Sequence, residues 1–193
     1  MTELRVYREN GERLLTCSGF DEICGIVEQT GAHLEHWPKA AGATGAHAAP
    51  AQVIEDYRDQ VDRLMQRYGF QSVDVVSMWP GHPRKHGLRD QFLGEHTHDD
   101  FEVRFFISGQ ALFYIHAGGL VYGLLCGPGD IIAVPAGAPH WFDMGPSPSF
   151  QCIRLFSTPE GWAAKYTGDT IPNRFPRLEQ PHYDAPQAAE AAA

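Results

Sequence analysis

The chain has 193 residues, 43% of them hydrophobic and 20% charged, and it carries a formal net charge of −9. This length is enough for one domain with a single core, and the abundance of apolar residues argues against bulk disorder. The negative charge argues against nucleic-acid binding, which needs a basic face, and against docking on anionic lipid.

The amino-terminal part predicts short strands and one helix. The expected elements are strands over residues 4–8 and 13–16, a helix over 20–29 and a strand over 33–37. His33 and His36 do not share a face of the last strand, so we expect both on the surface. The first residues contain no apolar signal region, and the four cysteines form no Cys-x-x-Cys pair. We therefore expect a cytoplasmic protein with reduced thiols.

The middle of the chain predicts a loop, a long helix and a strand. Residues 39–50 are rich in Ala and Gly and predict a mobile loop. Apolar residues at helical spacing predict a helix over 53–68, and β-forming residues predict a strand over 72–79. His82 and His86 are four residues apart, which is a metal-ligand spacing if the segment is helical, but the glycine and two prolines there predict a loop. Residues 88–93 predict a short turn of helix or an irregular lead-in.

From residue 103 onward, short strands alternate with Gly- and Pro-containing turns. The expected strands are 103–107, 111–116, 120–126, 130–134, 139–144 and 150–156. Such a series with no helices between its strands predicts a mainly β fold, an antiparallel barrel with a few peripheral helices. The apolar run 111–126 is interrupted by His116 and a Gly-Gly pair, so it predicts a hairpin and not a membrane span. A short helix over 159–166 completes one domain, residues 1–179, and 180–193 predict a flexible tail.

Three histidines and one glutamate have the spacing of a metal site. His96 and His98 are two residues apart and share one face of an extended strand, and Glu102 keeps the same parity. A turn or bulge at residues 99–100 can interrupt that strand. His140 follows a Pro-x-Gly turn and must arrive from another strand. A lone buried histidine is usually a core residue, but core packing does not put four ionisable groups on one face.

The donor types indicate which ions and which neighbours the site needs. Three nitrogens and one carboxylate suit Fe(II), Ni(II), Co(II), Mn(II) or Zn(II), and they leave room for a bidentate substrate. Arg104 follows the glutamate by two residues and is a candidate to stabilise anionic oxygens. Arg154 lies on an otherwise apolar strand, so it is either a second catalytic group or a structural ion pair. Phe92, Phe142 and Trp162 are candidates to line an apolar substrate pocket.

The ligand spacing resembles the cupin family. The first cupin motif is matched from its first histidine onward by His96-x-His98, Glu102 and Gly109, and the second by Gly129, Pro135-x-Gly137 and His140. Two positions depart from the pattern, because Asp90 stands where a glycine is usual and Met144 replaces the closing asparagine. The resemblance implies a cupin-type jelly-roll β-barrel with a metal in its mouth, and it implies no single reaction.

The residues around the motifs are similar to the acireductone dioxygenase family of methionine salvage. The similar stretches are 88–98, 102–106, 129–137, 140–144 and 159–162. This resemblance implies one Fe(2+) or Ni(2+) per chain and a small-molecule substrate, 1,2-dihydroxy-3-keto-5-(methylthio)pentene, cleaved with O2. It implies formate and 4-methylthio-2-oxobutanoate as products with iron. With nickel it implies formate, carbon monoxide and 3-(methylthio)propanoate. We expect a monomer.

Two alternatives stay open at this point. One is another metal-dependent cupin enzyme, either a different dioxygenase or a sugar isomerase. A phosphosugar isomerase should show a basic cluster for the phosphate, which the acidic, aromatic-rich flanks do not supply. The other alternative is a non-catalytic small-molecule-binding cupin, which does not require a complete ligand set.

Overall fold

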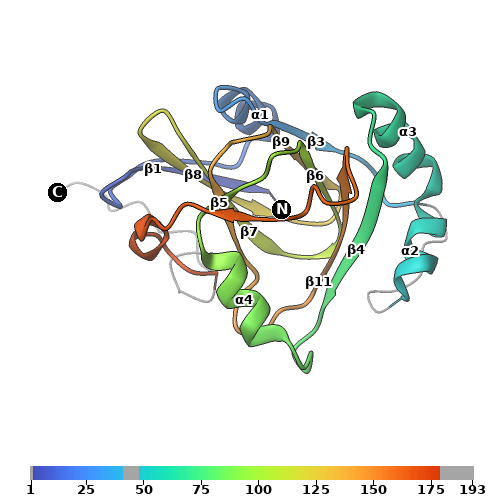
Figure 1. Cartoon of the computed structure of the whole chain (residues 1–193). Helices are drawn as coiled ribbons and strands as arrows, with labels where there is room; N and C mark the ends of the chain where they lie inside the picture. The colour runs from blue at the N-terminus through green and yellow to red at the C-terminus, as the bar shows by residue number, and fades with distance from the viewer. Residues whose placement is uncertain (1, 41–47, 179–193) are drawn as a thin grey trace.

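The computed structural model describes residues 2–40 and 48–178, and two antiparallel sheets dominate it (Figure 1). The seven-stranded sheet runs in the order β12 (Lys165–Tyr166), β5 (His96–Thr97), β10 (His140–Asp143), β7 (Ala111–Ala117), β8 (Leu120–Cys126), β1 (Glu3–Arg8) and β2 (Arg13–Cys17). The five-stranded sheet runs in the order β3 (His33–His36), β9 (Asp130–Val134), β6 (Glu102–Gly109), β11 (Phe150–Phe156) and β4 (Ser72–Met78). This confirms the mainly β, cupin-type barrel. The predictions for residues 41–47 and 180–193 lie outside the described residues.

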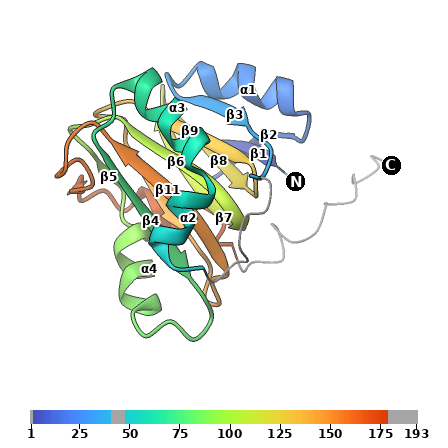
Figure 2. The same cartoon turned by 90° about the vertical axis from the view of Figure 1, so that its right-hand side faces the viewer.

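Strand parity separates two apolar layers. On β6, Phe106 faces the core between the sheets, whereas Phe105 and its odd-numbered neighbours face outward. On β11, Cys152 likewise faces the core between the sheets and Ile153 faces outward. The outward residues are covered by helices α2 (Pro50–Asp56) and α3 (Arg58–Tyr68), which lie across the outer face of the five-stranded sheet (Figure 2). Both faces of this sheet are therefore buried.

The long helix predicted over 53–68 is interrupted. Tyr57 has φ −107° and ψ 19°, and it ends α2 and precedes α3. Its ring is buried and meets Phe105 edge-on with ring centroids 5.4 Å apart. The predicted apolar stripe is confirmed, because Val53 and Val61 on either side of the break are buried. Gly69 ends α3 with φ 72°, as its position predicts.

Two further predictions differ from the structure. Helix α4 (Lys85–Leu93) begins earlier than expected and includes His86, because Pro80 and Pro83 precede its first turn and do not interrupt it. The helix predicted over 159–166 is wrong: turns lead into β12, whose residues pair with β5. Elsewhere, helix α1 (Phe20–Glu28) and the surface positions of His33 and His36 match prediction, and a 3-10 helix spans Ile171–Arg174.

The remaining sequence predictions concern membranes and thiols. The part of the chain that the structure describes contains no helix with the length and apolarity needed to cross a bilayer. All four cysteines are free thiols, and Cys17, Cys126 and Cys152 are buried.

Candidate metal centre

The four predicted ligands are brought together at one end of the barrel. His96 lies on β5 and is the direct pairing partner of His140, the first residue of β10. Glu102 begins β6, in the other sheet. Between β5 and β6, residues 98–101 form a bend that carries the chain from one sheet to the other, and His98 is the first residue of this bend. All four side chains are buried.

Backbone carbonyls fix the tautomer of each imidazole. The Nδ1 atoms of His96, His98 and His140 lie 2.7, 3.1 and 2.8 Å from the carbonyl oxygens of Gly94, Ala163 and Ala138 respectively. A carbonyl can only accept a hydrogen bond, so each Nδ1 must donate a proton. In the neutral rings, Nε2 then carries the free lone pair. One nitrogen from each ring lies within 4.8 Å of the others.

Several polar atoms at this point lack a hydrogen-bond partner in the part of the chain that the structure describes. Among the described residues, the buried atoms His98 Nε2, His140 Nε2 and Glu102 Oε2 make no hydrogen bond. Oε2 lies 3.4 Å from His140 Nε2 and 3.7 Å from His98 Nε2. All three are acceptors, and leaving buried acceptors unpaired and facing one another is costly. A divalent cation between them would satisfy all three, so the residues fit a metal ion.

The protonation states also match a metal site. Burial, with a contribution from His140, lowers the pKa of His96 to about 3, and burial likewise lowers the pKa of His98. Burial alone would raise the pKa of Glu102, but Arg104 and the two neighbouring histidines hold it well below its usual value. At neutral pH His96 and His98 are therefore neutral and Glu102 is ionised, which are the forms that bind metals.

Arg104 stands beside the ligands and points into a cavity. Its Nε donates to Glu102 Oε1 at 2.9 Å, and its buried Nη1 has no hydrogen-bond partner among the described residues. The guanidinium lies 4.7 Å from the ring centroid of Phe142, and the rings of Phe113 and Phe92 lie at 5.7 and 5.9 Å. Aromatic faces attract a cation and restrict its orientation. One donor is thus held in place without an acceptor among the described residues.

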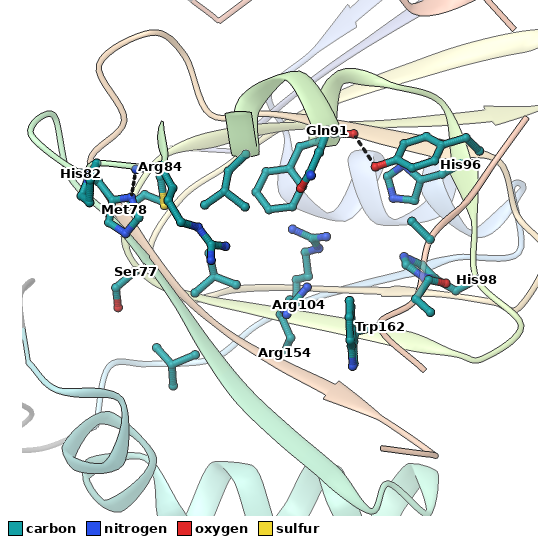
Figure 3. Close-up of a pocket in the computed structure, with 18 residues that line it drawn as sticks. Ser77, Met78, His82, Arg84, Gln91, His96, His98, Arg104, Arg154 and Trp162 are labelled. Atoms are coloured by element: carbon teal, nitrogen blue, oxygen red, sulfur yellow. Dashed lines mark hydrogen bonds between the residues drawn. The ribbon is translucent and has the colours of Figure 1, made fainter. Parts of the chain in front are cut away.

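The cavity has a volume of about 690 Å³ and runs from the metal ligands to the far end of β4. In Figure 3, His96 and His98 lie at one end, Met78 and His82 at the other, and Arg104 between them. Phe92 and Trp162, two of the three candidates for a substrate pocket, both line this cavity, and Trp162 is 58% exposed at its rim. Phe142 does not line it, because its ring lies behind Arg104 in the core.

Arg154 lines the same cavity but has a partner. Its Nε and Nη2 donate to the two carboxylate oxygens of Asp74 at 2.9 and 2.5 Å, in the bidentate geometry typical of a structural ion pair. The two residues are paired across β11 and β4, and Arg104 is paired with Arg154 on the other side. Of the two interpretations that the sequence left open, this geometry favours the ion pair.

Sequence reasoning missed several residues around the site. Helix α4 contributes Leu88 and Gln91 to the cavity wall, and Tyr166 on β12 donates from its hydroxyl to the Gln91 carbonyl at 3.2 Å. Leu88 and Gln91 lie within residues 88–93, for which the sequence left open a turn of helix or an irregular lead-in, so the side that they face was not predicted; residues 165–166 were expected to be helical. The carbonyls that orient the histidines come from the backbone, so no residue type could have indicated them. His82 and His86 are not among the residues of the three-histidine group, the one cluster of its kind in the described ranges.

A buried centre of three histidines and a carboxylate, facing a cavity in a barrel of this topology, defines a metal-dependent enzyme of the cupin type. Residues 3–164 match the ARD/ARD' family, and the chain belongs to that family. It is 46% identical over 180 residues to the acireductone dioxygenase of Aquifex aeolicus, covering 93% of this chain and 98% of the relative. It is 47% identical over 181 residues to that of Marinobacter nauticus, covering 93% and 97%.

A solved structure supports the same relationship. The acireductone dioxygenase from Bacillus anthracis with a cadmium ion in its active center superimposes with a TM-score of 0.74 and 26% identity. The match covers 86% of this chain and 98% of that one. The sequence resemblance to this family is therefore confirmed over the whole barrel. Among the alternatives left open by the sequence, the family match favours the dioxygenase over an isomerase or a non-catalytic cupin.

Proposed function

We propose that the protein is a dioxygenase that cleaves 1,2-dihydroxy-3-keto-5-(methylthio)pentene with O2, using one iron or nickel ion per chain. The observation that carries the proposal is the buried group of unpaired ligand atoms facing a cavity beside a fixed guanidinium. The names of the relatives supply the substrate class. The products are 4-methylthio-2-oxobutanoate and formate for the iron form. For the nickel form they are 3-(methylthio)propanoate, formate and carbon monoxide.

Four side chains would hold the ion: His96, His98, Glu102 and His140. Imidazole and carboxylate donors suit Fe(II) and Ni(II), and a closed structural zinc site would normally contain sulfur ligands. When bound, the ion supplies a Lewis acid that favours the ionised form of the enediol and holds it in one orientation. The assignment of Fe(2+) or Ni(2+) as the resident ion is part of the proposal.

Arg104 binds and orients the anionic substrate. Arg104 lines the cavity, its Nε is occupied by Glu102, the ring of Phe142 lies beside the guanidinium, and Nη1 has no hydrogen-bond partner among the described residues. The planar fork can donate to two neighbouring oxygens, as an enediolate presents them. A donor that is fixed before substrate arrives stabilises developing negative charge without reorganisation.

The rest of the cavity accommodates the thioether tail and excludes water. Val76, Met78, Leu88 and Phe92 line the wall away from the ligands, and all are apolar. Sulfur makes favourable contacts with apolar and aromatic side chains. Trp162 covers part of the rim next to the histidines (Figure 3). Arg154, whose donors are taken by Asp74, contributes positive charge and holds the cavity wall.

The test uses protein stripped of metal and reloaded with Fe2+ under anaerobic conditions. On mixing with the acireductone and O2, we expect loss of the enediolate absorbance, equimolar O2 uptake, and formate with the keto acid by mass spectrometry. The control is the stripped protein. Metal-loaded protein that consumes substrate no faster than the stripped protein would overturn the proposed reaction. A monomer in the cytoplasm also stays a prediction, and light scattering of the loaded protein tests the monomer.

A further inference from the structure

The segment of residues 157–166, here called the cover segment, lies across the bend that carries His98. It is attached to that bend at its start and to β5 at its end. At its start, the backbone N–H groups of Ser157 and Thr158 donate to Asp100 Oδ2 at 2.6 and 2.9 Å. At its end, β12 pairs with β5, with Tyr166 opposite His96. Between the two attachments lie Trp162 at the cavity rim and the Ala163 carbonyl.

The three ligand histidines differ in where their orienting carbonyl comes from. His96 and His140 each donate to a carbonyl two residues earlier in the chain, so local backbone geometry fixes them. His98 donates to Ala163, which is 65 residues away. Its tautomer and ring direction therefore depend on the tertiary placement of the cover segment.

Asp100 is the side chain that fixes this placement next to the ligand. Its Oδ1 accepts from the Phe101 N–H at 2.7 Å, so the carboxylate is held by the bend as well as by the cover segment. The fit is close: a Cβ at position 161 would lie 2.3 Å from Asp100 Oδ2 and 2.9 Å from Phe156 Cβ. Only glycine at 161 allows the cover segment to approach the carboxylate this closely.

We propose that Asp100 is a positioning residue for the metal centre, acting through the cover segment and the Ala163 carbonyl to orient His98. The inference rests on the proposed metal site. Partners that orient a ligand histidine affect metal binding strongly, and their loss typically lowers affinity by about 10–100-fold. Asp100 would not contact the ion itself; its role would be to keep His98 Nε2 facing the ion.

The experiment measures metal binding without substrate, so its outcome is independent of whether the proposed reaction is correct. Stripped wild-type, Asp100→Ala and Asp100→Asn proteins are titrated with Ni2+ against a chelator, and the visible spectrum of the Co2+ form reports the ligand geometry. We expect about 10–100-fold weaker Ni2+ binding and an altered Co2+ spectrum for Asp100→Ala. Asp100→Asn keeps an acceptor oxygen and should recover part of the affinity.

Asp99→Asn is the matched control: the Asp99 carboxylate also contacts the cover segment, through Lys165, but both side chains are exposed, and an exposed ion pair contributes little. It removes the same charge and should leave Ni2+ affinity and the Co2+ spectrum unchanged. Gly161→Ala displaces the cover segment while Asp100 remains, and we expect it to weaken Ni2+ binding in the same direction. If Asp100→Ala does not fold, the Gly161→Ala variant still tests the inference. Wild-type affinity and spectrum in folded Asp100→Ala or Gly161→Ala protein, or an equal loss in Asp99→Asn, would overturn the inference.

Discussion

Replacing Arg104 with lysine should leave the metal in place but slow turnover by about 10²–10³-fold. Lysine retains a positive charge beside Glu102, whose low pKa depends mainly on that charge among its neighbours. The carboxylate therefore stays ionised and available to the ion. What lysine lacks is a second donor nitrogen, because all the N–H groups of an ammonium leave one atom, whereas the guanidinium is a planar fork.

The magnitude follows from the two tasks that the guanidinium performs together. Nε occupies Glu102 Oε1 at 2.9 Å, and Nη1 remains free for the substrate. A single ammonium group that pairs with the carboxylate cannot also reach into the cavity, and it lacks the flat surface that packs 4.7 Å from the Phe142 centroid. The loss is that of one preorganised donor, about 2.7–4 kcal/mol of transition-state stabilisation.

Steady-state turnover of Arg104→Lys, at metal content matched to the wild type by elemental analysis, tests this reasoning. Arg154→Lys is the comparison, because Asp74 already takes the donors of Arg154 and a smaller loss is expected. An Arg104→Lys variant that turns over at the wild-type rate would reduce Arg104 to a structural partner of Glu102. A loss of metal from this variant would show that the charge alone does not maintain the ligand.

Four further predictions concern the ligands, protons, metal identity and a turn. Single alanine variants of the four candidate ligands should each lose bound metal and activity; the four are His96, His98, Glu102 and His140. A variant with stoichiometric metal and full turnover would show that its ligand is misassigned. Because the pKa of His96 falls from 6.5 to about 3 on folding, the unfolded chain binds more protons between these values. As the pH drops through that window, this group should therefore lower the unfolding free energy of the metal-free protein by up to about 1.4 kcal/mol per pH unit. Urea denaturation at a series of pH values measures this dependence, and His96→Gln should make it less steep. The iron form should release no carbon monoxide and the nickel form should release it, by headspace analysis; identical products from both would refute control by the metal. Gly109 has φ 69°, and a Cβ there would lie 1.7 Å from the Ser149 carbonyl oxygen, so Gly109→Ala should lower the unfolding free energy by at least about 1 kcal/mol. Gly25→Ala, where a Cβ would meet open space, should not lower it, and chemical denaturation compares the two variants.

The candidate ligand residues could be selected from the sequence because their types and spacing match a metal site. His96 and His98 lie two residues apart, and His140 follows the turn that precedes β10, whereas strand parity could not indicate the bend that carries the chain from β5 to Glu102 in the other sheet. The hairpin of β7 and β8 was equally predictable, since strong β-formers flank its Gly-Gly turn. In these cases the information is local.

The features that could not be predicted depend on tertiary contacts. The expected helix over 159–166 is replaced by the cover segment because Gly161 packs against Asp100 and the next residues pair with β5. The break at Tyr57 accompanies the burial of its ring against Phe105, which propensity does not report. The ion pair of Arg154 required knowing that β4 lies beside β11, which no spacing in the sequence specifies.

The three carbonyls that hold the imidazoles have a consequence for how the protein matures. The hydrogen bonds that orient the three rings run to backbone carbonyls, so they belong to the fold and not to the ion. In small zinc-dependent domains the opposite holds, because the chain is unfolded until the metal arrives. Because the apolar layers of the barrel are built without the ion, we expect the chain to fold before it binds metal. Loading of the ion would then be a separate event from folding, and the metal supply at that moment would decide which ion is bound.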